Sequence, residues 1–258
     1  YTIYGTEDEI LGYGQYGEYL AVFKKGNIDT NIYIRSVQDL GELGIAFPTS
    51  IGVGGAIGGL TQHTILNMDG ETLYLTNQGI YALTSLSLTN MKVTRNRSYF
   101  IDGLLLKEEN LQNAVACTWK QKYFLCVNSR CYILDGTESK KYLDSTNNEY
   151  AYECLYWDNV PATSFLSTKD KLYFGTDDGR ICVFTENEYY DGDRPTEMLI
   201  STVLDDDGDF MALKKMKKKG TGILVKPYLK SSFDISFLYD TYAETKVKTA
   251  YADIFNFN

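Results

Sequence analysis

The chain has a single histidine, His63, among its 258 residues. Any catalytic dyad or triad that uses histidine as its base would therefore depend on this one residue. No serine stands in a Gly-x-Ser-x-Gly elbow, and no cysteine lies near His63 in the sequence. The cysteines form no Cys-x-x-Cys pair, so the usual spacing of a zinc site is missing too. We therefore expect a structural or solvent-exposed His63, and no catalytic, cofactor-binding or metal site.

Long apolar runs and flexible linkers are also missing. No stretch of ~18 uninterrupted apolar residues exists, so we expect neither a transmembrane helix nor a membrane partner. The chain has only four prolines and no long Ser/Pro or Gly/Ser linker, which favours one domain over residues 1–258. It begins at Tyr1 without an initiator Met and ends on the strand-like run Ile254–Asn258. We therefore expect a fragment of a longer polypeptide, or a mature product.

The chain has fewer basic than acidic side chains, 25 against 34, which gives a formal net charge of −9. A surface of that sign repels phosphate backbones, so general nucleic-acid binding is not expected. The run Lys214–Lys219 opposes this trend and could grip an acidic partner or a nucleic-acid strand. We favour a charged strand edge that discourages edge-to-edge pairing.

The cysteines are odd in number, and all lie in apolar, strand-like surroundings: Cys117, Cys126, Cys131, Cys154 and Cys182. Buried free thiols in a reducing compartment are the favoured interpretation. Cys126 and Cys131 flank a tight turn and could face one another across a hairpin, which leaves a disulfide between them open.

The sequence does contain a clear internal repeat. Apolar runs centred on Tyr19, Tyr74, Tyr123 and Tyr173 recur at intervals of 55, 49 and 50 residues. Each run follows another apolar segment across a polar turn such as Asp69-Gly70, and each precedes a third apolar segment. Asp-Gly between apolar runs is a strong hairpin signal, because both turn positions need a residue that tolerates positive φ. A period of ~50 residues with several short strands predicts a β-propeller.

The predicted fold is therefore all-β, a propeller of about five blades or a large part of a bigger one. Each blade has three to four antiparallel strands, and the repeats lie near 8–40, 62–92, 112–158, 162–204 and 212–250. Outer strands are predicted at Tyr152–Trp157 and Met198–Thr202, and the fifth unit at Ile223–Leu229 and Phe233–Tyr239. One short helix is predicted within Ser98–Asn110, where Gly103 interrupts an apolar stripe.

Two kinds of segment have a composition that could bind phosphate or calcium. The glycine-rich run Gly52–Gly59 lacks the Lys-Ser/Thr of a P-loop and the dinucleotide spacing, so a flexible connection between blades is favoured. The acidic runs Asp191–Asp193 and Asp205–Asp209 could wrap a hard cation, but neither fits the EF-hand pattern. Solvated turns are the favoured interpretation, and calcium binding stays open.

A carbohydrate-active or carbohydrate-binding propeller is the alternative function. Such a site would pair carboxylates at the mouth of a central channel, and the candidates are Asp102, Glu153 and Asp158. The stretch Tyr156–Pro161 places aromatic residues beside the last of these, although no Asp-box is present. A cellular WD40-like scaffold is disfavoured because the repeated Gly-His and Trp-Asp signatures are missing.

Three stretches carry a resemblance to a known family. They are GYGQYGEYLAVFKK at Gly12–Lys25, MDGETLYLTNQGIYAL at Met68–Leu83, and the closing unit Leu213–Asp240, with LKKMKKK and then VKPYLKSSFDISFLYD. The chain resembles the β-propeller structural proteins of tailed bacteriophages and prophages, of the tail or head-to-tail stabilisation type. The resemblance implies a non-enzymatic virion part that is assembled in the bacterial cytoplasm and binds other virion structural proteins. It supplies no catalytic residues.

Overall fold

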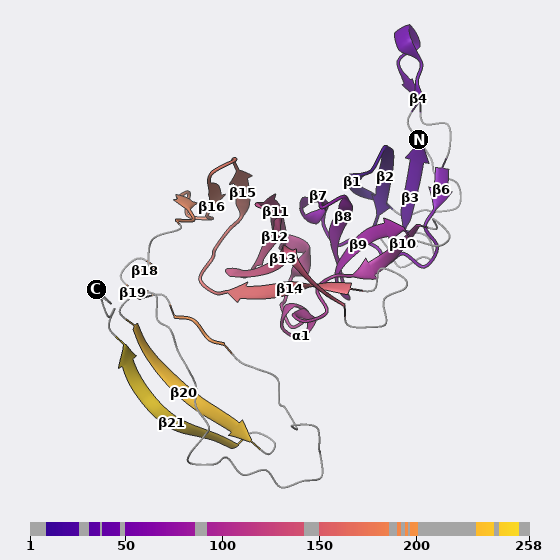
Figure 1. Cartoon of the computed structure of the whole chain (residues 1–258). Coiled ribbons are helices and arrows are strands. Elements are labelled where there is room, and N and C mark those ends of the chain that lie inside the picture. The colour runs from indigo at the N-terminus through magenta and orange to yellow at the C-terminus, as the bar shows by residue number, and fades with distance from the viewer. Residues whose placement is uncertain are drawn as a thin grey trace, which may run out of the picture. The chain divides into compact units, whose positions relative to one another are not determined.

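The computed structural model describes residues 9–25, 31–36, 38–46, 50–85, 92–141, 150–185, 190–191, 194–195, 197–200, 231–239 and 243–252. Strands dominate and helices are few and short (Figure 1), so the predicted all-β class is confirmed. The sequence predicts a single domain, whereas contacts between residues divide the chain into two compact units, residues 1–187 and 188–258.

Four antiparallel sheets follow one another along the first unit. The first contains β1 (Ile10–Tyr16), β2 (Tyr19–Lys24), β3 (Ile32–Ser36) and β6 (Ser50–Gly52). The second contains β7 (Leu66–Met68), β8 (Glu71–Thr76), β9 (Gly79–Ser85) and β10 (Lys92–Asn96). The third contains β11 (Val115–Trp119), β12 (Lys122–Val127), β13 (Arg130–Lys141) and β14 (Tyr150–Trp157). The fourth contains β15 (Ser164–Ser167), β16 (Leu172–Gly175) and β17 (Ile181–Val183). The first three strands of each sheet fall within the ranges of the first four predicted repeats, whereas β6 and all but the first residue of β10 lie beyond them.

Tight turns set the register of these sheets. Asp69 and Gly70 have φ of 51° and 80° and join β7 to β8, as the Asp-Gly signal predicts. Asn128 and Ser129, with φ of 51° and 62°, join β12 to β13 in the same way. Two successive residues with positive φ form the hairpin turn whose twist matches that of the strands it connects. The order of strands within each sheet is thus largely a local consequence of these turns.

The tyrosine-centred runs are the second strands of the sheets, and two of them are buried on both faces. On β12, Tyr123 and Leu125 pack in the cluster that joins the second and third sheets. Phe124 and Cys126 alternate with them and pack in the cluster shared with the fourth sheet. Side chains alternate across a strand, so a strand covered on both faces reads as a continuous apolar run. The repeat in the sequence therefore corresponds to successive sheets that pack against one another.

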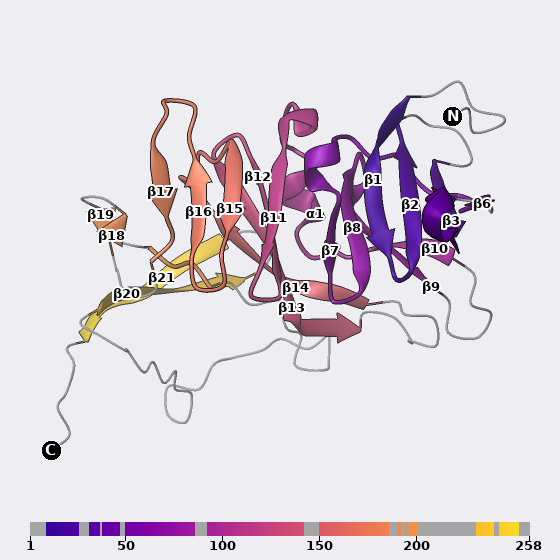
Figure 2. The ribbon, with the colours of Figure 1, turned by 90° about the horizontal axis from the view of Figure 1, so that it is seen from above.

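The first strands of the four sheets lie beside one another in chain order. β1 contacts β7, β7 contacts β11, and β11 contacts β15, as Figure 2 shows. Glycine permits the first of these approaches, since a Cβ on Gly14 would lie 2.8 Å from Thr72 Cγ2 and 3.0 Å from Phe23 Cε2. Gly14 lies within β1, and Gly17, with φ of 58°, forms the turn that joins β1 to β2.

Short elements connect the sheets. They are β4 (Gln38–Asp39), η1 (Gly41–Leu43), β5 (Ile45–Ala46), η2 (Gln62–Thr64), α1 (Asp102–Leu105) and η3 (Leu111–Asn113). The helix predicted within Ser98–Asn110 is thus a single turn between β10 and β11. Gly103 lies inside it, and glycine disfavours the continuation of a helix. Asn110, with φ of 56°, precedes η3 and is left-handed.

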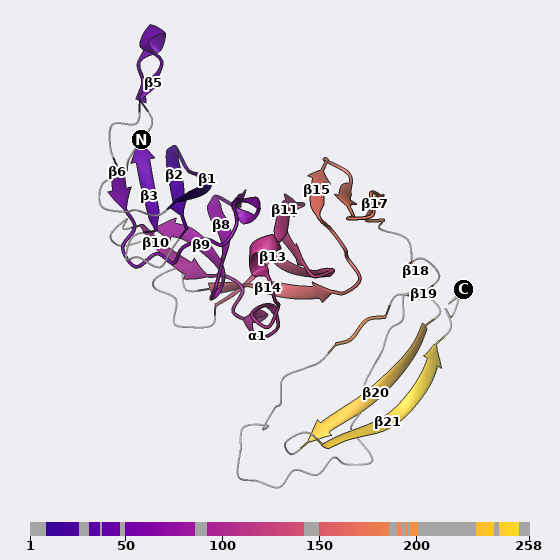
Figure 3. The ribbon, with the colours of Figure 1, turned by 180° about the vertical axis from the view of Figure 1, so that it is seen from behind.

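The second unit contains two hairpins among its described residues. They are β18 (Tyr190–Asp191) with β19 (Arg194–Pro195), and β20 (Ser231–Tyr239) with β21 (Ala243–Ala252), seen in Figure 3. β20 confirms the strand predicted at Phe233–Tyr239. The outer strand predicted from Met198 is wrong for residues 198–200, which lie in no strand and pair with none of the described strands. Residues 201–202, 223–229 and the Lys214–Lys219 run lie outside the described residues.

Candidate functional site

An open pocket of about 640 Å³ lies where the first strands of three sheets begin. Ten residues line it: Glu9, Ile10, Leu11, Lys25, Leu60, Thr61, Gln62, His63, Gln112 and Asn113. They come from the start of β1, the end of β2, the segment through η2 that precedes β7, and η3, which precedes β11. Because β1, β7 and β11 lie side by side, the segments that lead into them meet at one end of the sheets.

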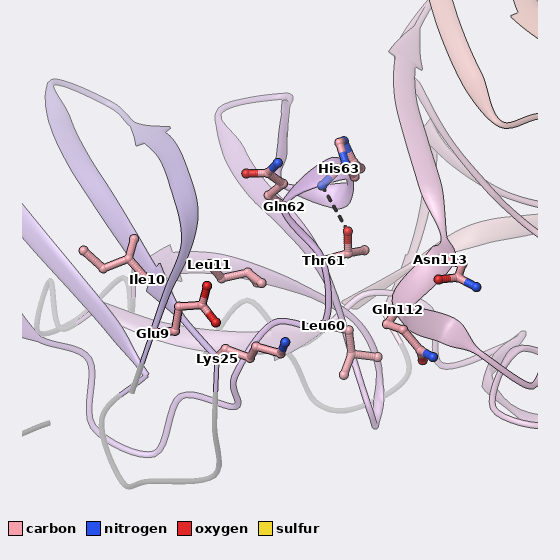
Figure 4. Close-up of a pocket in the computed structure, with 10 residues that line it drawn as sticks. All are labelled: Glu9, Ile10, Leu11, Lys25, Leu60, Thr61, Gln62, His63, Gln112 and Asn113. Carbon is pink, nitrogen blue, oxygen red and sulfur yellow. Dashed lines mark hydrogen bonds between the residues drawn. The ribbon is translucent and has the colours of Figure 1, made fainter. Parts of the chain in front are cut away.

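Polar side chains surround this pocket from opposite sides. Figure 4 shows Glu9, Ile10 and Lys25 on one side, Gln112 and Asn113 on the other, and Thr61, Gln62 and His63 between them. Leu11 and Leu60 add apolar surface to the lining. The lining thus offers three side-chain amides, one carboxylate, one ammonium group and one imidazole. Side-chain amides both donate and accept hydrogen bonds, so the pocket suits a ligand with alternating donors and acceptors.

Two hydrogen bonds, one partly buried and one buried, hold the central wall of the pocket. Thr61 accepts from the backbone N–H of His63 at 3.4 Å, which caps η2. Tyr123 Oη, from β12, donates to the carbonyl of Thr64 at 2.7 Å. Burial raises the pKa of Tyr123 well above its ordinary value, so this hydroxyl remains a donor at all physiological pH values. This bond joins β12 of the third sheet to η2, the segment that leads into the second sheet.

The other walls are fixed by backbone contacts. The N–H of Lys25 donates to the carbonyl of Glu9 at 3.0 Å, which joins the end of β2 to the start of β1. A Cβ on Gly12 would lie 3.0 Å from Ile65 Cδ1 and 3.1 Å from Gln62 Cβ, so glycine lets β1 approach η2. The N–H of Asn113 donates to the carbonyl of Asn110 at 2.8 Å and closes η3. The backbone frame of the pocket is therefore preformed.

His63 is the only residue singled out in the sequence that lines this pocket. It is exposed, as one of the two favoured interpretations expects. The sequence patterns do not single out Glu9, Lys25, Gln62, Gln112 or Asn113. Each of them stands beside a strand or a short helix of the repeat, but the sequence does not show which of these ends meet.

The three candidate carboxylates lie elsewhere. Asp102 accepts hydrogen bonds from Ser98 Oγ at 2.5 Å and from Asn96 Nδ2 at 2.6 Å, at the start of α1. Glu153 lies on β14, the strand of the third sheet farthest from β11. Asp158 is exposed just after β14. None of the three lines the pocket, so the structure does not bring them to the mouth between the first strands.

Asp102 and Glu153 do share one neighbour, the thiol of Cys154. Burial raises the pKa of Cys154 to about 12, and the negative charges of the two carboxylates add to that effect. Trp157, the predicted aromatic neighbour of Asp158, packs its ring 6.0 Å from Phe124 and 5.6 Å from Phe184. That ring is therefore part of the packing between the third and fourth sheets.

The remaining sequence candidates have structural surroundings where they are described. Val53 and Ala56, inside the glycine-rich run, are buried in the cluster between the first and second sheets, which corrects the expectation of a flexible connection. All five cysteines are free, including Cys126 and Cys131, which oppose one another on β12 and β13. Asp191 lies on β18, and the run Asp205–Asp209 lies outside the described residues.

The described residues contain neither a cluster of metal-ligating side chains nor a helix that could span a membrane. Among those residues, no group of three or more His, Cys, Asp or Glu side chains could hold a metal ion. The described helices are too short and too polar for one of them to span a bilayer. No protein-family model matches the chain, and a search of curated proteins gives no match either.

Proposed function

We propose that this chain is a non-enzymatic structural protein of a phage or prophage virion, a β-propeller scaffold that acts through protein–protein contacts. The observation that best supports a propeller scaffold is that β1, β7, β11 and β15 lie side by side in chain order. Each of these strands opens a sheet in which successive strands pair antiparallel, and the sheets bury their faces against one another. Sheets arranged in this way around one axis are propeller blades. The assignment to a virion rests on the resemblance in sequence.

The pocket is the proposed contact site for a partner protein. Its backbone frame is fixed, while its lining mixes amide, charged and apolar side chains. A protruding loop of a partner offers backbone N–H and C=O groups that side-chain amides can pair with, and an apolar side chain can cover Leu11 and Leu60. Binding sites commonly lie at loops that a rigid scaffold holds in position. Contact with other virion structural proteins is therefore assigned to this end of the sheets.

Site-specific crosslinking tests this proposal. A photoreactive p-benzoylphenylalanine replaces Gln112 at the pocket, and in a matched control it replaces Leu43, which is exposed on η1. Both variants are expressed in bacteria that produce the particle, and crosslinked proteins are identified by mass spectrometry. We expect the pocket position alone to capture a structural protein of the particle. Equal capture at both positions, or none, contradicts the proposal.

The virion assignment has a separate test in the genes around this one. We expect neighbours that encode head, tail or connector proteins, and a neighbourhood without them contradicts that part of the proposal.

Carbohydrate binding is the second candidate, because Gln62, Gln112 and Asn113 could hydrogen-bond to sugar hydroxyls. Apart from His63, however, the lining has no aromatic ring on which a sugar could stack. A glycan array separates the two functions. Binding that disappears in the double variant Gln62→Ala/Gln112→Ala would favour the carbohydrate function.

A further inference from the structure

Among the described strands, none pairs with the outer edge of β14, the last strand of the third sheet. β14 is eight residues long and ends the strand order β11-β12-β13-β14. Its sequence, YAYECLYW, contains one charged residue, Glu153. Proteins protect exposed edges by keeping them short, charged or covered, because unpaired backbone groups recruit further strands. β14 is neither short nor strongly charged.

The outer strands of the other three sheets differ from β14. β6 and β17 are three residues long, and β10 places Lys92 and Arg95 within five residues. On β14, Leu155, Tyr156 and Trp157 are 45%, 41% and 40% exposed. Three consecutive large apolar residues are thus partly open to solvent at a sheet edge.

The register of the third sheet shows which backbone groups point outward. Val127 and Arg130 flank the two-residue turn of the β12–β13 hairpin, so they bond to each other, and the next residue, Cys131, bonds to β14. Cys131 lies opposite Trp157, and Ile133 lies opposite Leu155. Alternation then turns the N–H and C=O groups of residues 154 and 156 away from β13.

A hydrogen bond at Tyr152 gives the same result independently. Its N–H donates outward to the carbonyl of Arg97 at 3.1 Å, so residues two and four positions later also point outward. Within the described part of the chain, the backbone groups of Cys154 and Tyr156 have no such partner. This gap in hydrogen bonding can be filled only by another extended backbone or by water.

We propose that β14 pairs antiparallel with β14 of a second copy of this chain, about a two-fold axis at Leu155. In this register Leu155 lies opposite Leu155 of the second copy, and Cys154 lies opposite Tyr156. Both outward residues then exchange N–H···O bonds with their counterparts, as a hydrogen-bonded antiparallel pair requires. Two four-stranded sheets become one continuous eight-stranded sheet. A two-fold interface uses the same patch on both copies, which this edge provides.

Charge at this edge does not oppose the proposed register. The net charge of −9 on each copy disfavours association in general, so a contact between two copies needs a patch with few charges. At this edge the only carboxylate, Glu153, lies opposite Trp157 of the second copy, and no like charges face each other. The proposal is independent of the virion assignment and of the pocket, because it depends only on β14.

Sedimentation velocity of the purified chain tests the pairing. The contact is small, so we expect association to depend on concentration over ~1 to ~200 μM. Leu155→Lys and Leu155→Glu each place like charges face to face on the axis, and each should reduce dimerisation at least ~10-fold. An equimolar mixture of the two variants places opposite charges there and should restore a heterodimer.

Leu43→Lys on η1 is the matched control, because Leu43 is 87% exposed and lies between β4 and β5, outside the third sheet. It should dimerise like the unaltered chain, and circular dichroism checks that every variant is folded. A chain that stays monomeric throughout the concentration range overturns the proposal. The outer groups of β14 would then bind water or a strand of another protein. Failure of the mixed charge variants to associate overturns the register.

Discussion

The substitution Glu71→Gln tests whether a buried ion pair stabilises the junction of the second and third sheets. Arg97, just after β10, is fully buried and donates from Nε to Glu71 Oε2 at 2.9 Å and from Nη2 to Oε1 at 2.6 Å. The hydroxyl of Tyr152, on β14 of the third sheet, lies 3.4 Å from the same carboxylate. Glutamine keeps the shape of the side chain but removes the charge that faces the guanidinium.

The expected loss follows from the cost of leaving a buried charge without its counter-charge. Removing one partner of a buried ion pair typically costs about 3–5 kcal/mol. We expect the lower end, about 3 kcal/mol, because glutamine still offers one acceptor to Arg97. For a unit of this size, that loss lowers the melting temperature by ~6–12 °C.

Tryptophan fluorescence during urea or thermal unfolding measures this loss in the first unit alone. Both tryptophans of the chain, Trp119 on β11 and Trp157 on β14, belong to that unit. Asp178→Asn, which breaks an exposed pair with Arg180, is the control and should leave the unfolding midpoint nearly unchanged.

Two results would refute the reasoning. One is a loss below about 1 kcal/mol in Glu71→Gln, which would mean that the guanidinium does not depend on its carboxylate. The other concerns the double variant Glu71→Leu/Arg97→Met, which removes both charges and should be more stable than Glu71→Gln. A double variant that is less stable than the single one would mean that the packing of these two side chains, and not their charges, stabilises the junction.

Three further predictions concern acid stability, thiol reactivity and close packing. Burial alone would raise the pKa of Glu108, but hydrogen bonds from neighbouring side chains outweigh it and hold the pKa below its ordinary value. The ionised Glu108 should therefore stabilise the fold above pH ~4.5, and this stabilisation should be lost as the pH falls through the folded-state pKa. In Glu108→Gln the free energy of unfolding should depend less on pH in the acid range. An unchanged pH dependence contradicts this. Burial raises the pKa of Cys117 to about 12, so iodoacetamide at pH ~8 should label it only after unfolding, as peptide mass spectrometry can check. Gly14→Ala should destabilise the first unit by about 1–3 kcal/mol, because the added Cβ would overpack the contact with the second sheet. Gly54→Ala is the control, because its Cβ would meet nothing within 4 Å. Equal urea-unfolding midpoints for the two variants would refute the close approach at Gly14.

Some parts of the molecule were predictable because a local signal specifies them. The turn at Asp69-Gly70 demands positive φ, and Tyr123–Val127 reads as a strand because neighbouring sheets cover both of its faces. The strand Lys92–Asn96 was missed because it is an outer strand with polar side chains and shows no apolar alternation. The error at residues 198–200 has the opposite cause, since an apolar run becomes a strand only where another strand pairs with it.

The pocket was beyond the reach of sequence patterns for a different reason. Gln62, Gln112 and Asn113 are ordinary loop residues separated by up to about fifty positions, and nothing in their local sequence marks them as neighbours. The three carboxylates with the strongest local pattern, Asp102, Glu153 and Asp158, lie away from it. A site shared by several sheets depends on how the sheets pack.

The amino-acid sequence by itself determined the strands, the tight turns between them and their recurrence along the chain, because φ preferences and alternating hydrophobicity act over a few residues. Tertiary structure alone decided which strand ends meet at the pocket, that Arg97 faces Glu71, and that no described strand pairs with the outer edge of β14. Those features arise from contacts between residues distant in sequence, and only the packing of complete sheets against one another specifies them.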